Sequence, residues 1–426
     1  MKPFRITGLE AHQIGPFGDL KMAFPEKPKG MEDKAEIHIL TGENGVGKST
    51  VLEMLSPSFD SRSQQTLTSK ARKNDLVIFS EVSFSEGGSI HKIIRGKGVN
   101  IKSRNTIVTD YYNQMNSVNQ GTFSTAFFCY SGYRRVDQVK IESIKELLGH
   151  PFYNAVEFNY SIDPAYILQW ITNNIAKEAI AKSQDESKVA SRFRKAVSQL
   201  ENIVSQIINQ PVKFFLGYEP IDVVVEVNKE RLDFNLLPDG LKSIVSWLAD
   251  LLMRMDRVKW VDDIPVFERN FILFLDEIEV HMHPKWQRKI LPAVQGLFPN
   301  AQIFISTHSP FVIGSVDGAW IHKLVKPNGD SVAEEPILSE DGKSVQLILE
   351  EIFDLGELDM FGENVKNDLQ KFYGLINDVM KGSNGETTES LLHLARTLAV
   401  QSTELHTVVE MEIRQLNRKK NMQLAL

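Results

Sequence analysis

Cysteine is nearly absent from this chain of 426 residues. The single thiol, Cys129, excludes an intramolecular disulfide and any metal site built only from cysteines. Long apolar runs are missing as well, since none approaches the roughly 18 residues that a helix needs to cross a bilayer. The first ten residues also lack the apolar core of a signal peptide. We therefore expect a cytoplasmic protein with no membrane partner.

The chain also lacks an excess of positive charge. Its 48 Lys and Arg residues face 55 Asp and Glu residues, which excludes a broadly polybasic nucleic-acid binder but not a local basic strip. Residues 62–104 hold nine basic and three acidic residues, whereas residues 339–426 hold nine basic and 15 acidic residues. The first is a candidate nucleic-acid surface and the second a candidate partner surface. Solvated faces without partners explain either pattern as well.

The order of sequence patterns predicts an α/β head followed by a helical tail. Apolar runs at 37–40, 271–275 and 301–305 predict strands buried on both faces of a sheet, and residues 76–101 predict an antiparallel strand pair. We expect a head over residues 1–338, with a mixed sheet, an antiparallel β arm and a helical lobe inserted at about 140–255. Amphipathic helices over 339–426 predict an acidic tail for partner binding or oligomerisation.

A glycine-rich loop after the first buried strand carries the clearest chemistry. It matches the phosphate-binding pattern G-x-x-x-x-G-K-[ST] between a predicted strand and a predicted helix. Its backbone N–H groups and the helix N-terminus attract phosphate, Lys48 reaches the β and γ phosphates, and the Ser49 hydroxyl binds Mg²⁺. The sequence thus predicts ATP and Mg²⁺ as cofactors, and the loop contributes Glu43, Asn44, Gly45, Val46, Gly47, Lys48, Ser49 and Thr50.

Two further motifs follow buried strands. Asp276 and Glu277 end the run FILFL, where two carboxylates at the edge of a sheet suit Mg²⁺ binding by Asp276 and activation of water by Glu277. His308 follows the next buried run, within Ser-Thr-His-Ser, and could contact a γ-phosphate. We expect Lys48, Glu277 and His308 to form the catalytic set, with Ser49 and Asp276 holding the metal. A charged strand end and a structural histidine are the simpler explanations for each motif taken alone.

The order of these three motifs resembles the ATP-binding-cassette (ABC) ATPases. Within them, the stretch Glu-Ile-Glu-Val-His-Met-His-Pro at 277–284 is similar to one found in the branch that includes RecF, the SMC and Rad50 heads and the OLD-like ATPases. The resemblance implies a P-loop ABC-type head and makes 277–284 a loop that faces a second subunit. His281 and His283 could otherwise be read as metal ligands, but no Cys/His cluster accompanies them.

The resemblance also implies a signature loop that covers the nucleotide of a second subunit. Leu237 to Ser243 occupies its place, with Asp239, Gly240 and Lys242 as candidate contacts. The usual serine is replaced by Pro238, which has neither a hydroxyl nor an N–H group. We therefore expect a homodimer or higher oligomer in which ATP binding is secure and hydrolysis is slow.

Other residues are assigned by the same resemblance. Arg5 and Phe17 lie in N-terminal strands that border the base in this branch. Arg134 or Arg135 could meet phosphate or the second subunit, although surface arginines are an equally good explanation. Gln120 is one candidate for the glutamine that links Mg²⁺ to the helical lobe.

The length of the chain and its helical tail narrow the choice among the members of this branch. Fewer than 190 residues without sustained heptads separate Ser49 from Leu237, which excludes long coiled-coil arms. No nuclease motif stands out after His308. The chain most resembles the Septu ATPases of bacterial anti-phage defence, which implies control of a separate HNH-type nuclease. A RecF-like repair ATPase that binds duplex DNA through 62–104 is the alternative, and a transporter ATPase does not fit the 277–284 stretch.

Overall fold

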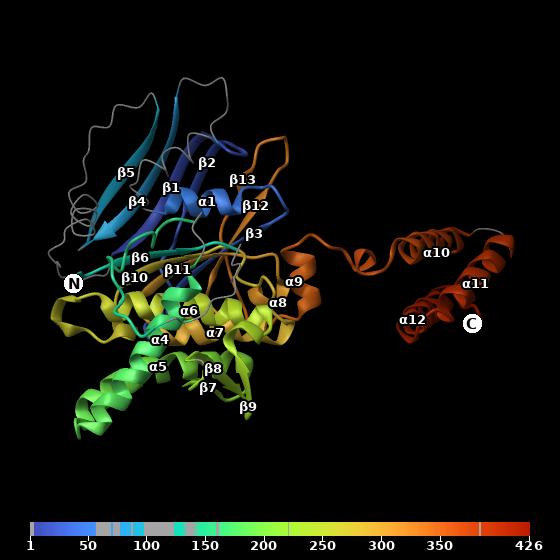
Figure 1. Cartoon of the computed structure of the whole chain (residues 1–426). Coiled ribbons are helices and arrows are strands. Elements are labelled where there is room, and N and C mark those ends of the chain that lie inside the picture. Colours follow the sequence, from blue (N-terminus) through green and yellow to red (C-terminus); the bar gives the residue numbers. More distant parts are fainter. Residues whose placement is uncertain are drawn as a thin grey trace. The chain divides into compact units, whose positions relative to one another are not determined.

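The computed structural model describes residues 4–56, 70, 77–86, 88–97, 123–132, 141, 143–158, 162–219, 221–382 and 385–426. Two compact units divide the chain, residues 1–345 and residues 346–426. Figure 1 labels the helices and strands of both units.

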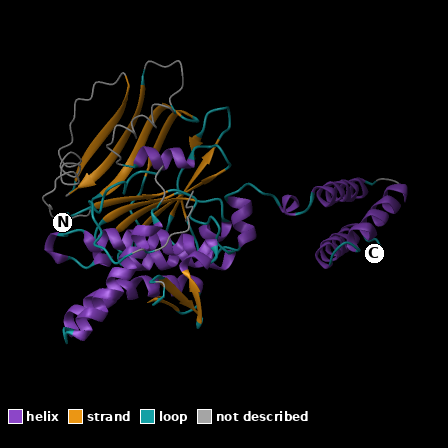
Figure 2. Ribbon diagram, in the orientation of Figure 1, coloured by secondary structure: helices purple, strands orange, loops and turns teal. Residues whose placement is uncertain are grey.

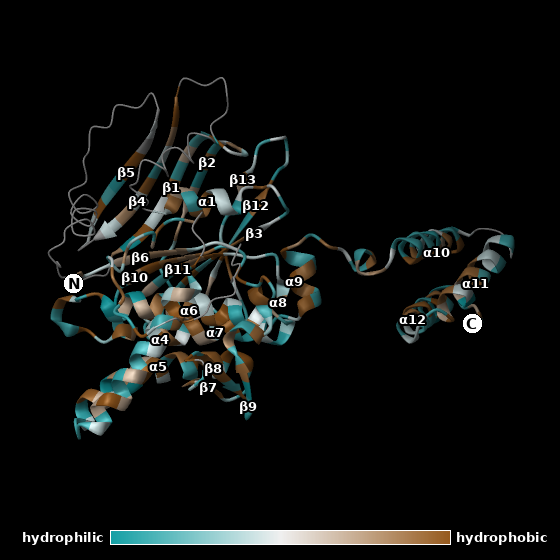
Figure 3. Cartoon of the chain, in the orientation of Figure 1, coloured by the Kyte–Doolittle hydropathy of each residue, from teal (hydrophilic) through white to brown (hydrophobic). Residues whose placement is uncertain are grey.

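A seven-stranded sheet forms the centre of the first unit. Its strand order is β13-β12-β3-β11-β10-β6, with β14 also paired to β12. The five strands from β12 to β6 run parallel, as expected of a sheet with helices on both faces. Every residue of β10 and β11 is buried, and Figure 3 shows both strands as apolar. The strands are β3 (Glu36–Gly42), β6 (Ala126–Tyr130), β10 (Phe271–Leu275), β11 (Ala301–Ser306), β12 (Trp320–Val325), β13 (Val332–Ala333) and β14 (Ile337–Leu338).

Helices and a second sheet cover the two faces of this sheet. Helix α1 (Lys48–Leu55) packs on one face, beneath an antiparallel sheet of order β2-β1-β4-β5 (Figure 2). Its strands are β1 (Arg5–Ile14), β2 (Phe17–Ala23), β4 (Ile78–Glu86) and β5 (Ser89–Lys97). On the other face lie α6 (Asp239–Arg257) and α7 (Pro284–Leu297), while the short α8 (Pro310–Ile313) follows β11. The predicted buried strands and the antiparallel pair are confirmed.

The helical lobe combines a helical hairpin with a small sheet. Helices α4 (Pro164–Ser183) and α5 (Ser187–Ile208) pair with each other and lead into the antiparallel sheet β7-β8-β9. Apolar residues recur every three or four positions along α5. They are buried at Val197, Leu200 and Val204, but Val189 is 40% exposed. The first turns of α5 project from the lobe in Figure 1, so the apolar pattern there has no core to enter. The strands are β7 (Val212–Leu216), β8 (Val223–Val227) and β9 (Glu230–Asp233).

The second unit has its own apolar core. Helices α10 (Glu363–Lys381), α11 (Gly385–Ala399) and α12 (Thr403–Lys420) pack together after α9 (Val345–Glu351), as the amphipathic pattern predicts. Its fully buried side chains are Leu369, Phe372, Leu391, Ala395, Leu398 and Val409. Among the described residues of both units, no helix is long and apolar enough to cross a membrane.

Candidate functional site

The glycine-rich loop joins the carboxyl end of β3 to the start of α1. Gly47 caps α1 with φ 104°, a left-handed conformation that favours glycine. Gly47 also has no room for a side chain, because a Cβ atom would lie 2.6 Å from Phe17 Cζ. Lys48 folds back over the loop, where its Nζ donates to the carbonyl oxygens of Gly42 at 3.1 Å and Glu43 at 2.9 Å. The loop is thus shaped as the motif predicts.

The order of strands brings the remaining motifs to the same edge. Strand β11 lies between β3 and β10, so their carboxyl ends are neighbours. The Ser49 hydroxyl donates to Asp276 Oδ1 at 3.0 Å, across 227 residues of chain. Ser306, the last residue of β11, also donates its hydroxyl to Asp276 Oδ1. The two predicted metal ligands therefore meet, and Ser306 contacts the same oxygen of Asp276.

The backbone of Glu277 is held in place by Ser306. Its N–H donates to Ser306 Oγ at 2.8 Å, and its φ of 44° is unusual for a residue with a side chain. Gly132, which follows β6, passes close beside it: a Cβ atom there would lie 2.8 Å from Glu277 Cβ. These contacts fix the backbone and Cβ of Glu277, and so the point from which its exposed side chain extends.

His308 is placed by a second glutamate. Its backbone N–H donates to Glu279 Oε1 at 2.6 Å. Burial raises the pKa of Glu279, and Glu279 Oε2 has no hydrogen-bond partner among the described residues. Burial and then the charge of Lys48 lower the pKa of His308, so its imidazole is neutral near pH 7. A neutral ring can donate one hydrogen bond to a phosphate oxygen.

The pKa of Lys48 responds to the acidic residues of the same edge. Burial lowers the pKa of Lys48, while the charges of Asp276, Glu277 and Glu279 act in the opposite sense. The three carboxylates therefore lie near enough to Lys48 to act on its charge. Lys48, Asp276 and His308 therefore belong to one site, although they come from three separate stretches of chain.

The geometry fits a magnesium ion. Two oxygens bound side by side to octahedral Mg²⁺ at about 2.1 Å stand about 3 Å apart, which matches the 3.0 Å between Ser49 Oγ and Asp276 Oδ1. No group of three His, Cys, Asp or Glu side chains suited to a metal occurs in the described part of the chain. His283 instead caps α7, where its Nδ1 accepts from the Lys285 N–H at 3.2 Å. A metal site at His281 and His283 is therefore not supported.

The signature-loop candidates lie at the start of α6. The Asp239 side chain is 79% exposed, and Lys242 Nζ lies 3.8 Å from it. Gly240 packs so closely on the carbonyl of His281 that a Cβ atom would come within 2.3 Å of that oxygen. The start of α6 thus abuts the 277–284 loop. Its contact with a second subunit stays a prediction.

Two expected nucleotide contacts are wrong. Arg5 pairs with Glu36 at 2.7 Å and donates to the carbonyl of Phe24. Glu36 begins β3 and Gly42 ends it, so Arg5 lies about 20 Å from the loop. Phe17 is fully buried and supports Gly47, so it offers no face to a base. Both residues stabilise the fold instead.

Several other candidates fall outside the described residues. They are Gln120, Arg134, Arg135 and most of the basic region 62–104. Two described lysines of that region form ion pairs, Lys70 with Glu53 and Lys92 with Glu81.

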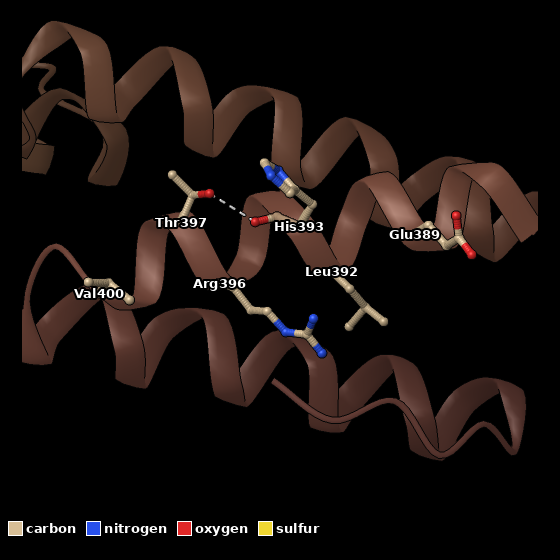
Figure 4. A pocket seen from close by; sticks show the side chains of 6 residues that line it. All are labelled: Glu389, Leu392, His393, Arg396, Thr397 and Val400. Carbon is tan, nitrogen blue, oxygen red and sulfur yellow. Dashed lines mark hydrogen bonds between the residues drawn. The ribbon is translucent and has the colours of Figure 1, made fainter.

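The second unit has a hollow of about 560 Å³ along α11. Figure 4 shows its lining side chains, and Thr397 donates there to the carbonyl of His393 at 3.0 Å. The lining is formed by Glu389, Leu392, His393, Arg396, Thr397 and Val400.

Sequence reasoning missed three residues of the edge: Ser306, Glu279 and Gly132. The only signal for Ser306 was its position at the end of a buried strand beside His308, and Glu279 stood within the 277–284 stretch. Gly132 had no local signal, because its role depends on β6 lying beside β10.

The chain is similar to several known proteins. Residues 164–314 match the family model "AAA domain, putative AbiEii toxin, Type IV TA system". The Septu protein PtuA of Bacillus thuringiensis is 22% identical over 83% of this chain and 85% of its own length. The Retron Vc95 probable ATPase of Vibrio cholerae serotype O1 biovar El Tor is 24% identical over 82% of both chains.

The comparison with solved structures found the SMC head domain from Thermotoga maritima. It is 14% identical with a TM-score of 0.41, covering 78% of this chain and 99% of that one.

This chain brings its phosphate-binding loop, the Asp276-Glu277 pair and His308 together at one sheet edge. It is a P-loop protein of the ABC-type ATPase kind, related to Septu PtuA and the retron ATPases.

Proposed function

We propose that this protein binds ATP with Mg²⁺ and hydrolyses it to ADP and phosphate. The observation that carries the proposal is the meeting of Ser49, Asp276 and Ser306, together with Lys48 above the same edge. Ser49 and Asp276 would hold the metal, and Lys48 would exchange its backbone carbonyl partners for phosphate oxygens.

The chain's own residues then divide the chemical work. Mg²⁺ supplies charge neutralisation on the phosphates. Glu277, whose exposed carboxylate borders Asp276, takes the proton of the attacking water. His308, neutral and held by Glu279, donates to the γ-phosphate. Pro238 in place of the signature serine removes one donor, so turnover is slow.

We infer that two or more copies assemble around the nucleotide. At the start of α6, Lys242 next to the exposed Asp239 supplies a positive charge for the phosphates of a neighbouring copy. Gly240 and the first N–H groups of α6 would add backbone donors.

We further infer a role in bacterial anti-phage defence, with an HNH-type nuclease as partner. Relationship to the Septu protein PtuA and to retron ATPases supports it. The second unit is acidic, at 8 − 13 = −5 over residues 346–426, and would suit a basic partner. Co-purification with the product of the neighbouring gene tests this. A complex that persists unchanged without residues 346–426 would show that another surface binds the partner.

Release of phosphate from ATP and Mg²⁺ tests the activity itself. The parent protein should release phosphate, and Lys48→Ala should lose both binding and hydrolysis because the phosphates lose their main cation. Lys285→Ala, which removes an exposed lysine outside the edge, is the matched control. Equal rates of hydrolysis by the parent and by Lys48→Ala would overturn the assignment of the ATP site to this loop.

A RecF-like ATPase that binds duplex DNA directly is the alternative. It rests on the basic region 62–104, where two described lysines, Lys70 and Lys92, form ion pairs with Glu53 and Glu81. Measuring ATP-dependent DNA binding against salt separates the two, since binding through phosphates weakens steeply as salt rises.

A further inference from the structure

A chain of buried polar groups connects α6 to the strand end that precedes Asp276. It begins at Tyr130, the last residue of β6, whose backbone carbonyl accepts the N–H of Asp276 at 2.9 Å. The Tyr130 hydroxyl donates to Asp250 Oδ2 at 2.8 Å, in the middle of α6. Tyr130 is 5% exposed and Asp250 is 3% exposed, so water does not weaken this bond.

Arg254 extends the chain by one helical turn. Its Nε donates to the same Asp250 oxygen at 2.6 Å, and its Nη1 donates to the carbonyls of Pro151 at 2.7 Å and Tyr153 at 2.8 Å. Burial and the neighbouring Asp250 raise the pKa of Tyr130, so its hydroxyl keeps the proton that it donates. The carboxylate of Asp250 therefore joins a strand end, a helix and a loop.

Helix α6 consequently contacts the segment from Asp276 to His281 at two places, once directly and once through Tyr130. Its first turn presses Gly240 against the carbonyl of His281, and its middle reaches the N–H of Asp276 through Tyr130. A displacement of α6 changes both ends of the stretch that holds Asp276 and Glu277.

We propose that Tyr130, Asp250 and Arg254 are positioning residues that set the place of Asp276 and couple it to α6. They touch no reacting atom. The inference rests on the proposed ATPase function, because Asp276 is there the metal ligand. It extends that function by assigning a route from the first turn of α6 to the metal carboxylate of the same chain.

Full-length Tyr130→Phe tests the proposal with little change of shape. We expect kcat to fall about tenfold or more, the loss that corresponds to one buried hydrogen bond to a charged group. Affinity for ATP without Mg²⁺ should stay at the parental value, because the glycine-rich loop is untouched, whereas the gain in affinity on adding Mg²⁺ should shrink. Tyr153→Phe removes a hydroxyl from a 68% exposed tyrosine nearby and should change neither quantity.

A second variant guards against simple misfolding. Asp250→Asn should reproduce the phenotype, and the double variant Tyr130→Phe/Asp250→Asn should lose no more than the larger single loss, because both act through one chain. Additive losses, or equal losses of Mg²⁺-free binding and kcat, would indicate a merely structural role and overturn the proposal.

Amide hydrogen exchange separates this inference from the ATPase proposal. In the nucleotide-free protein, the peptide over 271–277 should exchange faster in Tyr130→Phe than in the parent or in Tyr153→Phe. Unchanged exchange refutes the coupling even if the parent hydrolyses ATP. If the 271–277 peptide exchanges faster in Tyr130→Phe than in the parent, but the parent hydrolyses no ATP, the coupling is supported and the proposed activity is refuted.

Discussion

The hydroxyl of Ser306 accepts the backbone N–H of Glu277 at 2.8 Å while donating its own proton to Asp276. One buried side chain thus orients both acids, the carboxylate of one and the backbone of the other. Ser306 is fully buried at the end of β11, the strand between the phosphate-binding loop and the acids.

Ser306→Ala should therefore reduce hydrolysis more than binding. It leaves the N–H of Glu277 and one oxygen of Asp276 without this partner, so we expect kcat to fall about tenfold. Steady-state phosphate release and nucleotide titration measure the two effects. Ser246→Ala is the control, since that buried hydroxyl has no hydrogen-bond partner among the described residues. Similar losses in both variants would contradict the role of Ser306.

Glu277→Gln should keep ATP bound but slow its hydrolysis by about a hundredfold or more, because the amide cannot take a proton from water. The ATP-bound assembly should accumulate, which size-exclusion chromatography with ATP and Mg²⁺ can follow. Hydrolysis at the parental rate would remove Glu277 as the general base.

Gly132→Ala should disturb Glu277 by crowding alone. The new methyl group would lie 2.8 Å from Glu277 Cβ, so the acid must shift. We expect a lower kcat, by about tenfold, with ATP affinity near the parental value. Gly296→Ala in α7 has nothing within 4 Å of the added Cβ and should behave like the parent. A fully active Gly132→Ala enzyme would mean that Glu277 need not stay in place.

Glu279→Ala should release the backbone at His308, because Oε1 no longer accepts that N–H. We expect kcat to fall about tenfold. Glu279→Gln keeps an oxygen in the same place and should recover most of the activity. If Gln and Ala variants are equally slow, the charge of Glu279 matters rather than its hydrogen bond.

Acid should destabilise the first unit through Glu36. Burial alone would raise the pKa of Glu36, but His38 and then Arg5 outweigh it and lower the pKa to about 2. A lowered folded-state pKa stabilises the fold above the unfolded value of 4.5, and this stabilisation disappears as pH falls from 4.5 towards 2. The contribution is on the order of 3 kcal/mol. Urea unfolding at pH 7 and pH 3 measures it, and Glu36→Gln should flatten the difference.

Arg5→Met checks the corrected role of Arg5. It should lower the free energy of unfolding and leave ATP affinity unchanged, because Arg5 lies at the other end of β3 from the loop. A selective loss of ATP affinity would restore the original expectation.

Local sequence predicted the parts of the site whose chemistry is local. A glycine-rich turn between a strand and a helix needs only its own backbone, so Lys48 and Ser49 could be assigned from residues 42–50. Asp276 was found because it directly follows an apolar run, and His308 because it lies shortly after the next one. The projecting start of α5 shows the limit, since its apolar pattern at Val189 did not reveal that no core lies beside it.

Tertiary structure decided which strands are neighbours, and hence which side chains share the edge. With β11 between β3 and β10, Ser306 joins both acids, and with β6 beside β10, Gly132 and Tyr130 reach Glu277 and Asp276. Such contacts span many residues of chain and leave no local pattern. The sequence therefore determined the chemistry that this protein carries, because backbone and side-chain type are local properties. Only the folded sheet decided how that chemistry is aligned, because strand order depends on the packing of the whole domain.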